Sequence, residues 1–172
     1  QSSSWGNGMY KTLDGGRTWQ HLGLRETRHI GRIVVHPTNP DVVYVAAMGD
    51  LWSASKERGV YKTTDGGKTW QQVLFVNEDT GVNDIAIDPQ SPGTLYAGAY
   101  QRRRTVFGFS GSGPGSALYK TTDGGATWKK LTKGLPYDTE NAPTPLPSNR
   151  LETGRIGVNI YRKDPNVVYA LI

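Results

Sequence analysis

The sequence predicts an all-β protein assembled from repeated four-stranded units, and three observations support that prediction. One eight-residue motif (octet), Thr63–Trp70, occurs three times in the sequence, and the copies differ only at residues inside the motif. Gly and Pro, at 22 and 10 residues, can supply many turns, whereas helical patterning is scarce. Short runs rich in β-branched and aromatic residues recur between those turns, as strands require. We therefore expect one all-β fold over the 172 residues.

The octet reads Thr-Thr-Asp-Gly-Gly-Lys-Thr-Trp at Thr63–Trp70, with copies at Thr12–Trp19 and Thr121–Trp128, each preceded by Tyr-Lys. Asp-Gly-Gly places glycine where a tight turn needs positive φ, and the Asp side chain accepts hydrogen bonds from backbone N–H groups one or two residues further on. The Thr and Trp restart a strand, where the Trp ring can bury on the order of 150–250 Å². Each octet therefore predicts a self-contained β-hairpin.

Five positions of each octet are assigned a structural role: the first Thr, the Asp, the second Gly, the later Thr and the Trp. They are Thr12, Asp14, Gly16, Thr18, Trp19, Thr63, Asp65, Gly67, Thr69, Trp70, Thr121, Asp123, Gly125, Thr127 and Trp128. The aspartates recur after 51 and 58 residues, a spacing typical of stacked repeat units and close to that of propeller blades.

The pattern Ser/Thr-x-Asp-x-Gly-x-Thr-Trp resembles the Asp-box, or BNR repeat, of sialidases, xyloglucanases, bacterial multi-repeat proteins and sortilin-type receptor ectodomains. In those families the box is the turn between the third and fourth strands of a blade, on the rim and away from the central site. The resemblance thus implies a scaffold role for Asp14, Asp65 and Asp123. Together with the boxes, Arg28–Ile33 and Tyr100–Thr105 are similar to bacterial, exported multi-Asp-box proteins often called glycosyl hydrolases.

A second repeated sequence pattern predicts the remaining strands. Arg32–Pro37, the turn Thr38–Asp41 and Val42–Ala47 read as strand, turn and strand. The same pattern is repeated within Ile85–Ala99 and, with more differences, within Arg155–Leu171. Its nearly continuous apolar runs predict strands that are covered on both faces. Each complete unit is therefore a buried pair of strands followed by the Asp-box pair.

Lettered in blade order, the chain reads C-D, A-B-C-D, A-B-C-D, A-B, which is a β-propeller segment of about three blade-equivalents: a half-blade, two four-stranded blades and a half-blade. We place the units of this partial propeller, 1–172, at residues 1–29, 30–81, 82–135 and 136–172, the last beginning with a Pro-rich insert. Propellers close with about four to eight blades. The expected partners are therefore the remaining blades of a larger propeller, or copies of the chain associating through their half-blades.

The amino-acid composition excludes several kinds of functional site and partner. Without cysteine the chain has no disulfide, Cys-ligated metal or thiol nucleophile. The net charge of +5 includes Arg102–Arg104, so we expect a local loop feature and no nucleic-acid partner. The three histidines show no metal-ligand spacing, and we expect neither a metal nor a cofactor.

The sequence also bears on location. No apolar run approaches the roughly 20 residues that cross a bilayer, so we expect no membrane span. Gln1–Trp5 lacks the charged and apolar regions of a signal peptide. With the resemblance to exported proteins, this predicts an extracellular or periplasmic protein whose leader is absent from these residues.

Ligand chemistry is expected in the variable loops, because loops at one end of a propeller line its site. Two segments, Gly49–Arg58 and Tyr100–Phe109, join the second and third strands of their units. Trp52 and Tyr100, with Phe107 and Phe109, are candidates for a platform that stacks on sugar rings. Their alternative role is packing between blades.

Charged candidates lie in the same segments. A ligand carboxylate or sulfate, on a sugar or a peptide, can accept hydrogen bonds from Arg102, Arg103 and Arg104. Alternatively, these arginines remain solvated or form ion pairs with acidic residues of an adjacent blade. Catalysis by a glycosidase needs two carboxylates about 5–10 Å apart, and the sequence marks out no such pair. The carboxylates outside the boxes that such chemistry would have to use are Asp50, Glu57, Glu78, Asp79, Asp84 and Asp138.

Three functions remain open. The favoured one is a non-catalytic propeller scaffold that binds a protein or peptide. The second is part of a glycoside hydrolase, although a sialidase is disfavoured because Val34 and Gly157 stand where its Arg-Ile-Pro signature needs proline. The third is a glycan-binding surface without hydrolysis.

Overall fold

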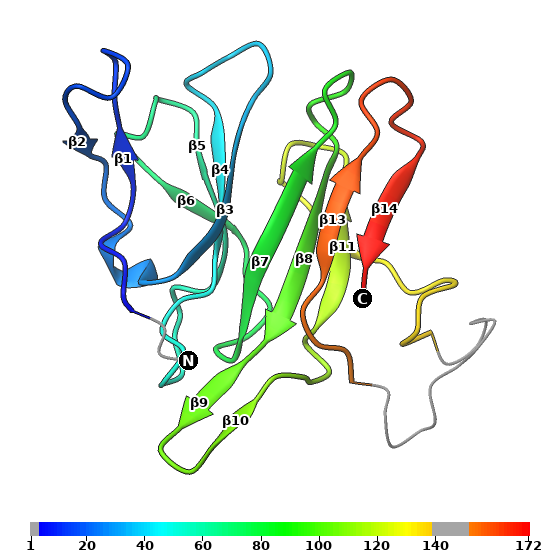
Figure 1. Cartoon of the computed structure of the whole chain (residues 1–172). Coiled ribbons are helices and arrows are strands. Elements are labelled where there is room, and N and C mark those ends of the chain that lie inside the picture. The colour runs from blue at the N-terminus through cyan, green and yellow to red at the C-terminus, as the bar shows by residue number, and fades with distance from the viewer. Residues whose placement is uncertain (1–3, 139–151) are drawn as a thin grey trace.

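The computed structural model of the protein describes residues 4–138 and 152–172, and it is an all-β structure of antiparallel sheets (Figure 1). The predicted fold class is therefore confirmed. A short 3-10 helix, η1 (Arg25–Thr27), lies between the first two units. No helix in the described part of the chain is long and apolar enough to span a membrane.

The two complete sheets have four strands each, in the order that the repeat predicts. The second blade is β3-β4-β5-β6 and the third blade is β7-β8-β11-β12. Their bounds are β3 Ile30–Val35, β4 Val43–Ala47, β5 Gly59–Thr63, β6 Gln71–Leu74, β7 Thr80–Ile87, β8 Leu95–Gln101, β11 Ala117–Thr121 and β12 Lys129–Lys130.

A two-stranded sheet flanks the complete blades on each side. The first half-blade pairs β1 (Tyr10–Lys11) with β2 (Gln20–His21), and the last half-blade pairs β13 (Gly157–Ile160) with β14 (Val168–Leu171). The blades fan out side by side along the chain (Figure 1). The first half-blade thus holds only outer strands, and the last holds only inner strands.

The strand directions divide the molecule into two ends. Because successive strands are antiparallel, the turns at 36–42 and 88–94 lie at the same end as the Asp-boxes. We call this the box end. The opposite end, which we call the loop end, carries the connections 48–58 and 102–116 and the links between blades. Figure 1 shows β9 and β10 projecting from the loop end.

The main core lies between the two complete blades. Tyr44, Val60, Val82, Ile85 and Leu95 belong to one buried cluster with small alanines on β4 and β8. The alanines let the two sheets approach closely, and their burial is the principal stabilising contribution of this interface.

Two expectations about the strands were wrong. Ile33 and Val35 on β3 are exposed rather than covered on both faces, because the described part of the first unit holds only β1 and β2. The segment after Tyr100 is not a plain loop: β9 (Arg103–Thr105) and β10 (Gly108–Ser110) form an additional hairpin. Most of the Pro-rich insert, at 139–151, lies outside the described residues.

Candidate functional site

Each Asp-box is closed by its own side chains. In the second blade, Asp65 Oδ1 accepts from the Thr69 amide at 3.0 Å, and Asp65 Oδ2 accepts from the Thr69 hydroxyl at 2.6 Å. The Thr63 hydroxyl donates to Asp65 and accepts from the Gly67 amide. The amide that Asp65 binds is thus four residues further on, not one or two as the sequence suggested, because the turn is wider than a two-residue hairpin.

The other two boxes repeat this geometry around Asp14 and Asp123. In all three, hydrogen bonds from the hydroxyl and amide of the later threonine, and then from the first threonine, hold the pKa of the aspartate well below its ordinary range. The paired glycines have positive φ in each box, as a turn of this kind requires. These aspartates are therefore ionised acceptors inside a turn.

The boxes also join neighbouring blades. The Tyr44 hydroxyl and the Lys62 amine of the second blade both donate to the carbonyl of Gly124 in the third-blade box, at 2.9 and 2.8 Å. Trp70 Nε1 donates across the preceding junction to the Leu22 carbonyl at 2.7 Å. Trp19, which has no blade before it among the described residues, is exposed.

At the loop end, one fully buried arginine organises the connections. Arg58 NH1 donates to the carbonyls of Asp79 and Arg102 at 2.7 and 3.0 Å. Arg58 NH2 donates to the carbonyls of Asp50 and Ser53 at 2.5 and 3.4 Å. Burial lowers the pKa of Arg58 to about 10, so the side chain stays charged at neutral pH. Sequence reasoning missed this residue, because nothing in the sequence distinguishes it from an exposed loop arginine.

The three consecutive arginines do not act together. Arg103 forms an ion pair with Asp79, which is the alternative of pairing with a neighbouring acid. Arg102 and Arg104 lie over the Phe109 ring instead, at 5.2 and 5.7 Å from its centroid. Alternation along β9 explains the division, since successive side chains of a strand point to opposite faces.

Tyr100 does not lie where a stacking platform needs it. Only 9% of the residue is exposed, and its ring packs with Met48 and Leu51 in a small cluster. The stacking role expected for Tyr100 is therefore corrected to packing beneath the loops.

The three other aromatic candidates are open to solvent at the loop end. Trp52 is 45% exposed, Phe107 98% and Phe109 58%. The Arg104 amide donates to the Leu51 carbonyl at 2.7 Å, which places the stem of the β9–β10 hairpin beside the segment that carries Trp52. We call Trp52, Phe107 and Phe109 the aromatic rim.

Most of the candidate carboxylates hold loops in place. Asp50 accepts from the Arg28 guanidinium, the Trp52 amide and the Ser53 hydroxyl, at 2.6 to 2.8 Å. Burial acts to raise its pKa, but these bonds and the Arg28 charge outweigh burial and lower it. Glu57 accepts from the Tyr61 hydroxyl at 2.8 Å.

Two further carboxylates lie nearer the inner strands and the insert. Asp84 accepts from the Val158 amide at 2.9 Å and joins the third blade to the last half-blade. Asp138 is buried and accepts from the Gly134 amide at 2.9 Å. Among the described residues, no three His, Asp or Glu side chains gather as metal ligands would.

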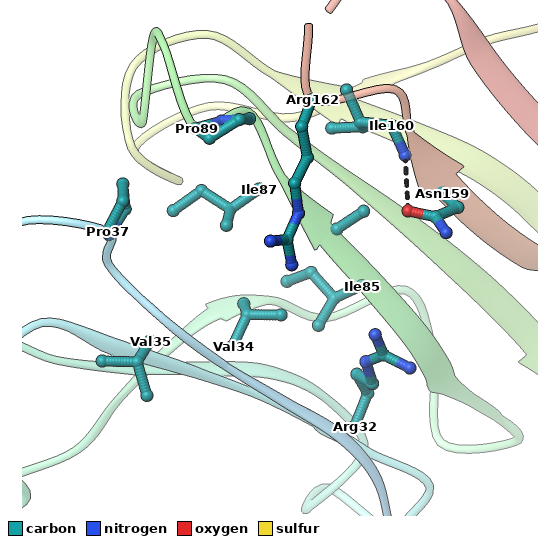
Figure 2. Close-up of a pocket in the computed structure, with 11 residues that line it drawn as sticks. Arg32, Val34, Val35, Pro37, Ile85, Ile87, Pro89, Asn159, Ile160 and Arg162 are labelled. Carbon is teal, nitrogen blue, oxygen red and sulfur yellow. Dashed lines mark hydrogen bonds between the residues drawn. The ribbon is translucent and has the colours of Figure 1, made fainter.

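A groove of about 350 Å³ crosses the inner strands β3, β7 and β13 (Figure 2). Val34 and Ile85 contribute apolar side chains to its lining. Figure 2 shows Arg32 and Arg162 reaching into it from opposite sides, with Asn159 beside them. Arg32 Nε lies 4.0 Å from Asp84 Oδ1. The sequence did not single out Arg162 as a site residue.

Comparison with known proteins places this geometry among Asp-box propellers. The model of the family Sortilin-Vps10, described as "Sortilin, neurotensin receptor 3", matches residues 7–139. A probable oligoxyloglucan-reducing end-specific xyloglucanase of Neosartorya fischeri is 31% identical over 104 residues, which are 58% of this chain and 10% of that protein. A xyloglucanase of Paenibacillus sp. is 23% identical over 137 residues, 72% of this chain and 12% of that protein.

Solved structures give the same result for the fold. An ancestral GH74 enzyme matches 95% of this chain and 19% of its own, with a TM-score of 0.65 and 20% identity. The GH74 enzyme of Niastella koreensis matches 94% of this chain and 21% of its own, with a TM-score of 0.62 and 20% identity. The chain thus spans about a tenth of the curated relatives and about a fifth of the solved ones.

Proposed function

Because the chain belongs to the Sortilin-Vps10 family of Asp-box repeat proteins, we propose that it is part of a larger, exported propeller whose loop end binds a xyloglucan-type polysaccharide. The complete protein acts on that polysaccharide as a glycoside hydrolase. This proposal is the alternative to the peptide-binding scaffold that the sequence alone favours. Its support is the likeness to xyloglucanases in both sequence and fold.

The aromatic rim is the observation that carries the proposal. Sugar rings present apolar faces that pack against aromatic side chains, and exposed aromatics that gather at one place indicate an interaction site more than singly exposed ones do. Trp52, Phe107 and Phe109 lie on neighbouring segments at one end of the blades, opposite the Asp-boxes. They are held there by Arg58, which fixes the connections that carry them.

This segment supplies binding, and we assign the catalytic acid pair to another part of the larger protein. Asp50, Glu57 and Asp79 are each engaged by an arginine or tyrosine of the loop end, which leaves them poorly placed to accept or donate protons during hydrolysis. Glycoside hydrolysis needs two carboxyl groups that face the scissile bond.

A second candidate function is recognition of a protein or peptide. The match to the sortilin-type family model supports it. Arg102 and Arg104 would then meet an acidic group of the peptide, since neither has an ion-pair partner among the described residues.

Binding of xyloglucan oligosaccharides to the chain, measured by calorimetry, separates these candidates. Trp52→Ala and Phe107→Ala should each weaken binding by up to about tenfold, the equivalent of one aromatic contact. Leu13→Ala is the control, because Leu13 is a large apolar residue that is 89% exposed but lies at the box end. No binding to the oligosaccharides, or equal effects of all three changes, would overturn the proposal.

A further inference from the structure

The groove of Figure 2 follows the inner edges of three neighbouring strands. β3 and β7 are the inner edge strands of the two complete blades, and β13 lies beside β7. Val34, Ile85 and Ile87 form its floor, and each belongs to the core between the two blades or packs against it. Because that core is close-packed, the floor keeps its shape without a ligand.

The polar side chains that line the groove present donors rather than acceptors. They are Arg32, Asn159 and Arg162, and no carboxylate of the described residues is part of the lining. Asn159 Oδ1 already accepts from the Ile160 amide at 2.9 Å, which leaves its Nδ2 as a free donor. A lining of guanidinium and amide donors is complementary to an anion.

Arg162 is held in place by the neighbouring blade. Gln90 Nε2, on a turn of the third blade, donates to the Arg162 and Lys163 carbonyls at 3.2 and 3.3 Å. These bonds fix the backbone that carries Arg162, while its side chain reaches into the groove (Figure 2). Within the described residues, the Arg162 guanidinium has neither an ion pair nor a hydrogen-bond acceptor. Its charge is therefore available to a ligand.

Arg32 is only loosely paired. Its Nε lies 4.0 Å from Asp84 Oδ1, which is beyond hydrogen-bond distance. Asp84 instead accepts from the Ile85 and Val158 amides, at 3.0 and 2.9 Å. The Arg32 side chain is 59% exposed, and its terminal nitrogens have no acceptor among the residues that the structure describes. These nitrogens are also available to a ligand.

The two arginines form a pair of like charges. Figure 2 shows their guanidinium groups extending toward one another from opposite sides of the groove, with Ile85 between them in this view. Water screens such charges less in a groove with an apolar floor than on an open surface, so their mutual repulsion is stronger there. A bound anion replaces this repulsion with two attractions.

We propose that this groove binds the tetrahedral oxyanion of a sulfate or phosphate ester, whose carbon body lies on the apolar floor. A carboxylate has two oxygens, and one bidentate arginine occupies both. A tetrahedral ester group has three free oxygens, which can accept from Arg32, Arg162 and Asn159 Nδ2 together. Three separate donors therefore favour the tetrahedral group. This site goes beyond the proposed function, because it lies on the inner strands and uses no residue of the aromatic rim.

Calorimetric titration of the chain with phenyl sulfate and phenyl phosphate tests the proposal, and benzoate is the planar anion with a similar carbon body. We expect at least one ester to bind about tenfold more tightly than benzoate, the equivalent of one further charge-assisted hydrogen bond. The tighter ester shows whether a sulfate or a phosphate source fits the groove better. No binding of either ester, or equal binding of benzoate, overturns the proposal.

Three variants locate the site. Arg32→Gln and Arg162→Gln should each weaken binding of the preferred ester by about tenfold, because each removes a charged donor. Lys163→Gln is the matched control, since it removes a positive charge next to Arg162, but Lys163 is exposed and does not line the groove. Its effect should stay within about twofold, because salt screens a charge that makes no direct contact. An equal loss from Lys163→Gln would show general attraction by positive charge and contradict the site.

Two further measurements separate the groove from the loop end and from effects on folding. Arg104→Gln should leave ester binding unchanged, because Arg104 does not line the groove. Loss of binding in that variant would assign the anion to the loop end and overturn the proposal. Saturating ester should raise the thermal midpoint of the wild-type chain but not that of Arg162→Gln, since only a bound ligand stabilises the folded state. Equal rises in both chains, or none in the wild type, would contradict binding in the groove.

Discussion

Arg58 illustrates how much of the loop end depends on a single residue. Its guanidinium reaches carbonyls on three connections that are distant in sequence, and no part of the residue is exposed. A planar group with five donors suits this arrangement better than any other side chain. The position of the aromatic rim therefore follows from one buried charge.

Arg58→Ala should lower the free energy of unfolding by about 3 kcal/mol or more, because several buried carbonyls lose a charged donor at once. Arg58→Lys should recover little, since one ammonium group cannot reach all four oxygens. Urea denaturation of the variants measures both effects. A loss below about 1 kcal/mol for Arg58→Ala would show that the arginine does not organise the loops.

At the scale of single elements, the Asp-box is the unit that holds a hairpin. Asp65→Ala removes the acceptor of the Thr69 amide, the Thr69 hydroxyl and the Thr63 hydroxyl together. We expect a clear drop in the thermal midpoint. Arg103→Ala breaks a partly exposed ion pair and should cost only about 0–1 kcal/mol. Equal effects of the two changes, measured by calorimetry, would contradict the structural role of the box.

The elements that sequence predicts well are those whose chemistry is local. Asp-Gly-Gly followed by Thr-Trp specifies its turn within eight residues, so all three box hairpins are where the pattern puts them. The β9–β10 hairpin was missed because its turn at Val106–Phe107 lacks the Asn-Gly or Asp-Gly signal. The exposure of β3 depends on which strands pack against it, and no local pattern reports that.

The candidate site was predicted only in part, for the same reason. Loops 49–58 and 100–109 were identified as the variable segments, and they do meet at one end of the blades. Which side chains face solvent depends on the pairing of β9 with β10. Packing of Tyr100 and pairing of Arg103 with an acid were each one of two alternatives, and local sequence could not choose between them because both depend on contacts with distant segments.

For the molecule as a whole, the three boxes predict a loss of stability in acid. Hydrogen bonds hold the pKa of Asp14, Asp65 and Asp123 below the ordinary value of 3.8. Groups of this kind stabilise the fold above their unfolded pKa, and that stabilisation is lost as the pH falls through the folded values. The thermal midpoint should therefore decline below about pH 4 on this account.

Circular dichroism melting curves from neutral pH to strong acid measure this decline. The control is the triple variant Asp14→Asn, Asp65→Asn and Asp123→Asn, which should be less stable at neutral pH and change less below about pH 4. If the thermal midpoint of the wild-type protein falls no more steeply in acid than that of the triple variant, the stabilising role of the ionised box aspartates is contradicted.

The central claim is that ligand binding and scaffold lie at opposite ends of the blades. Titration of the isotope-labelled chain with xyloglucan oligosaccharide, followed by amide chemical shifts, tests it most directly. The account predicts shifts at Trp52 and across Phe107–Phe109, with the amides of Gly67, Thr69 and Thr127 unmoved. Shifts concentrated at the box amides, or none anywhere, would contradict it.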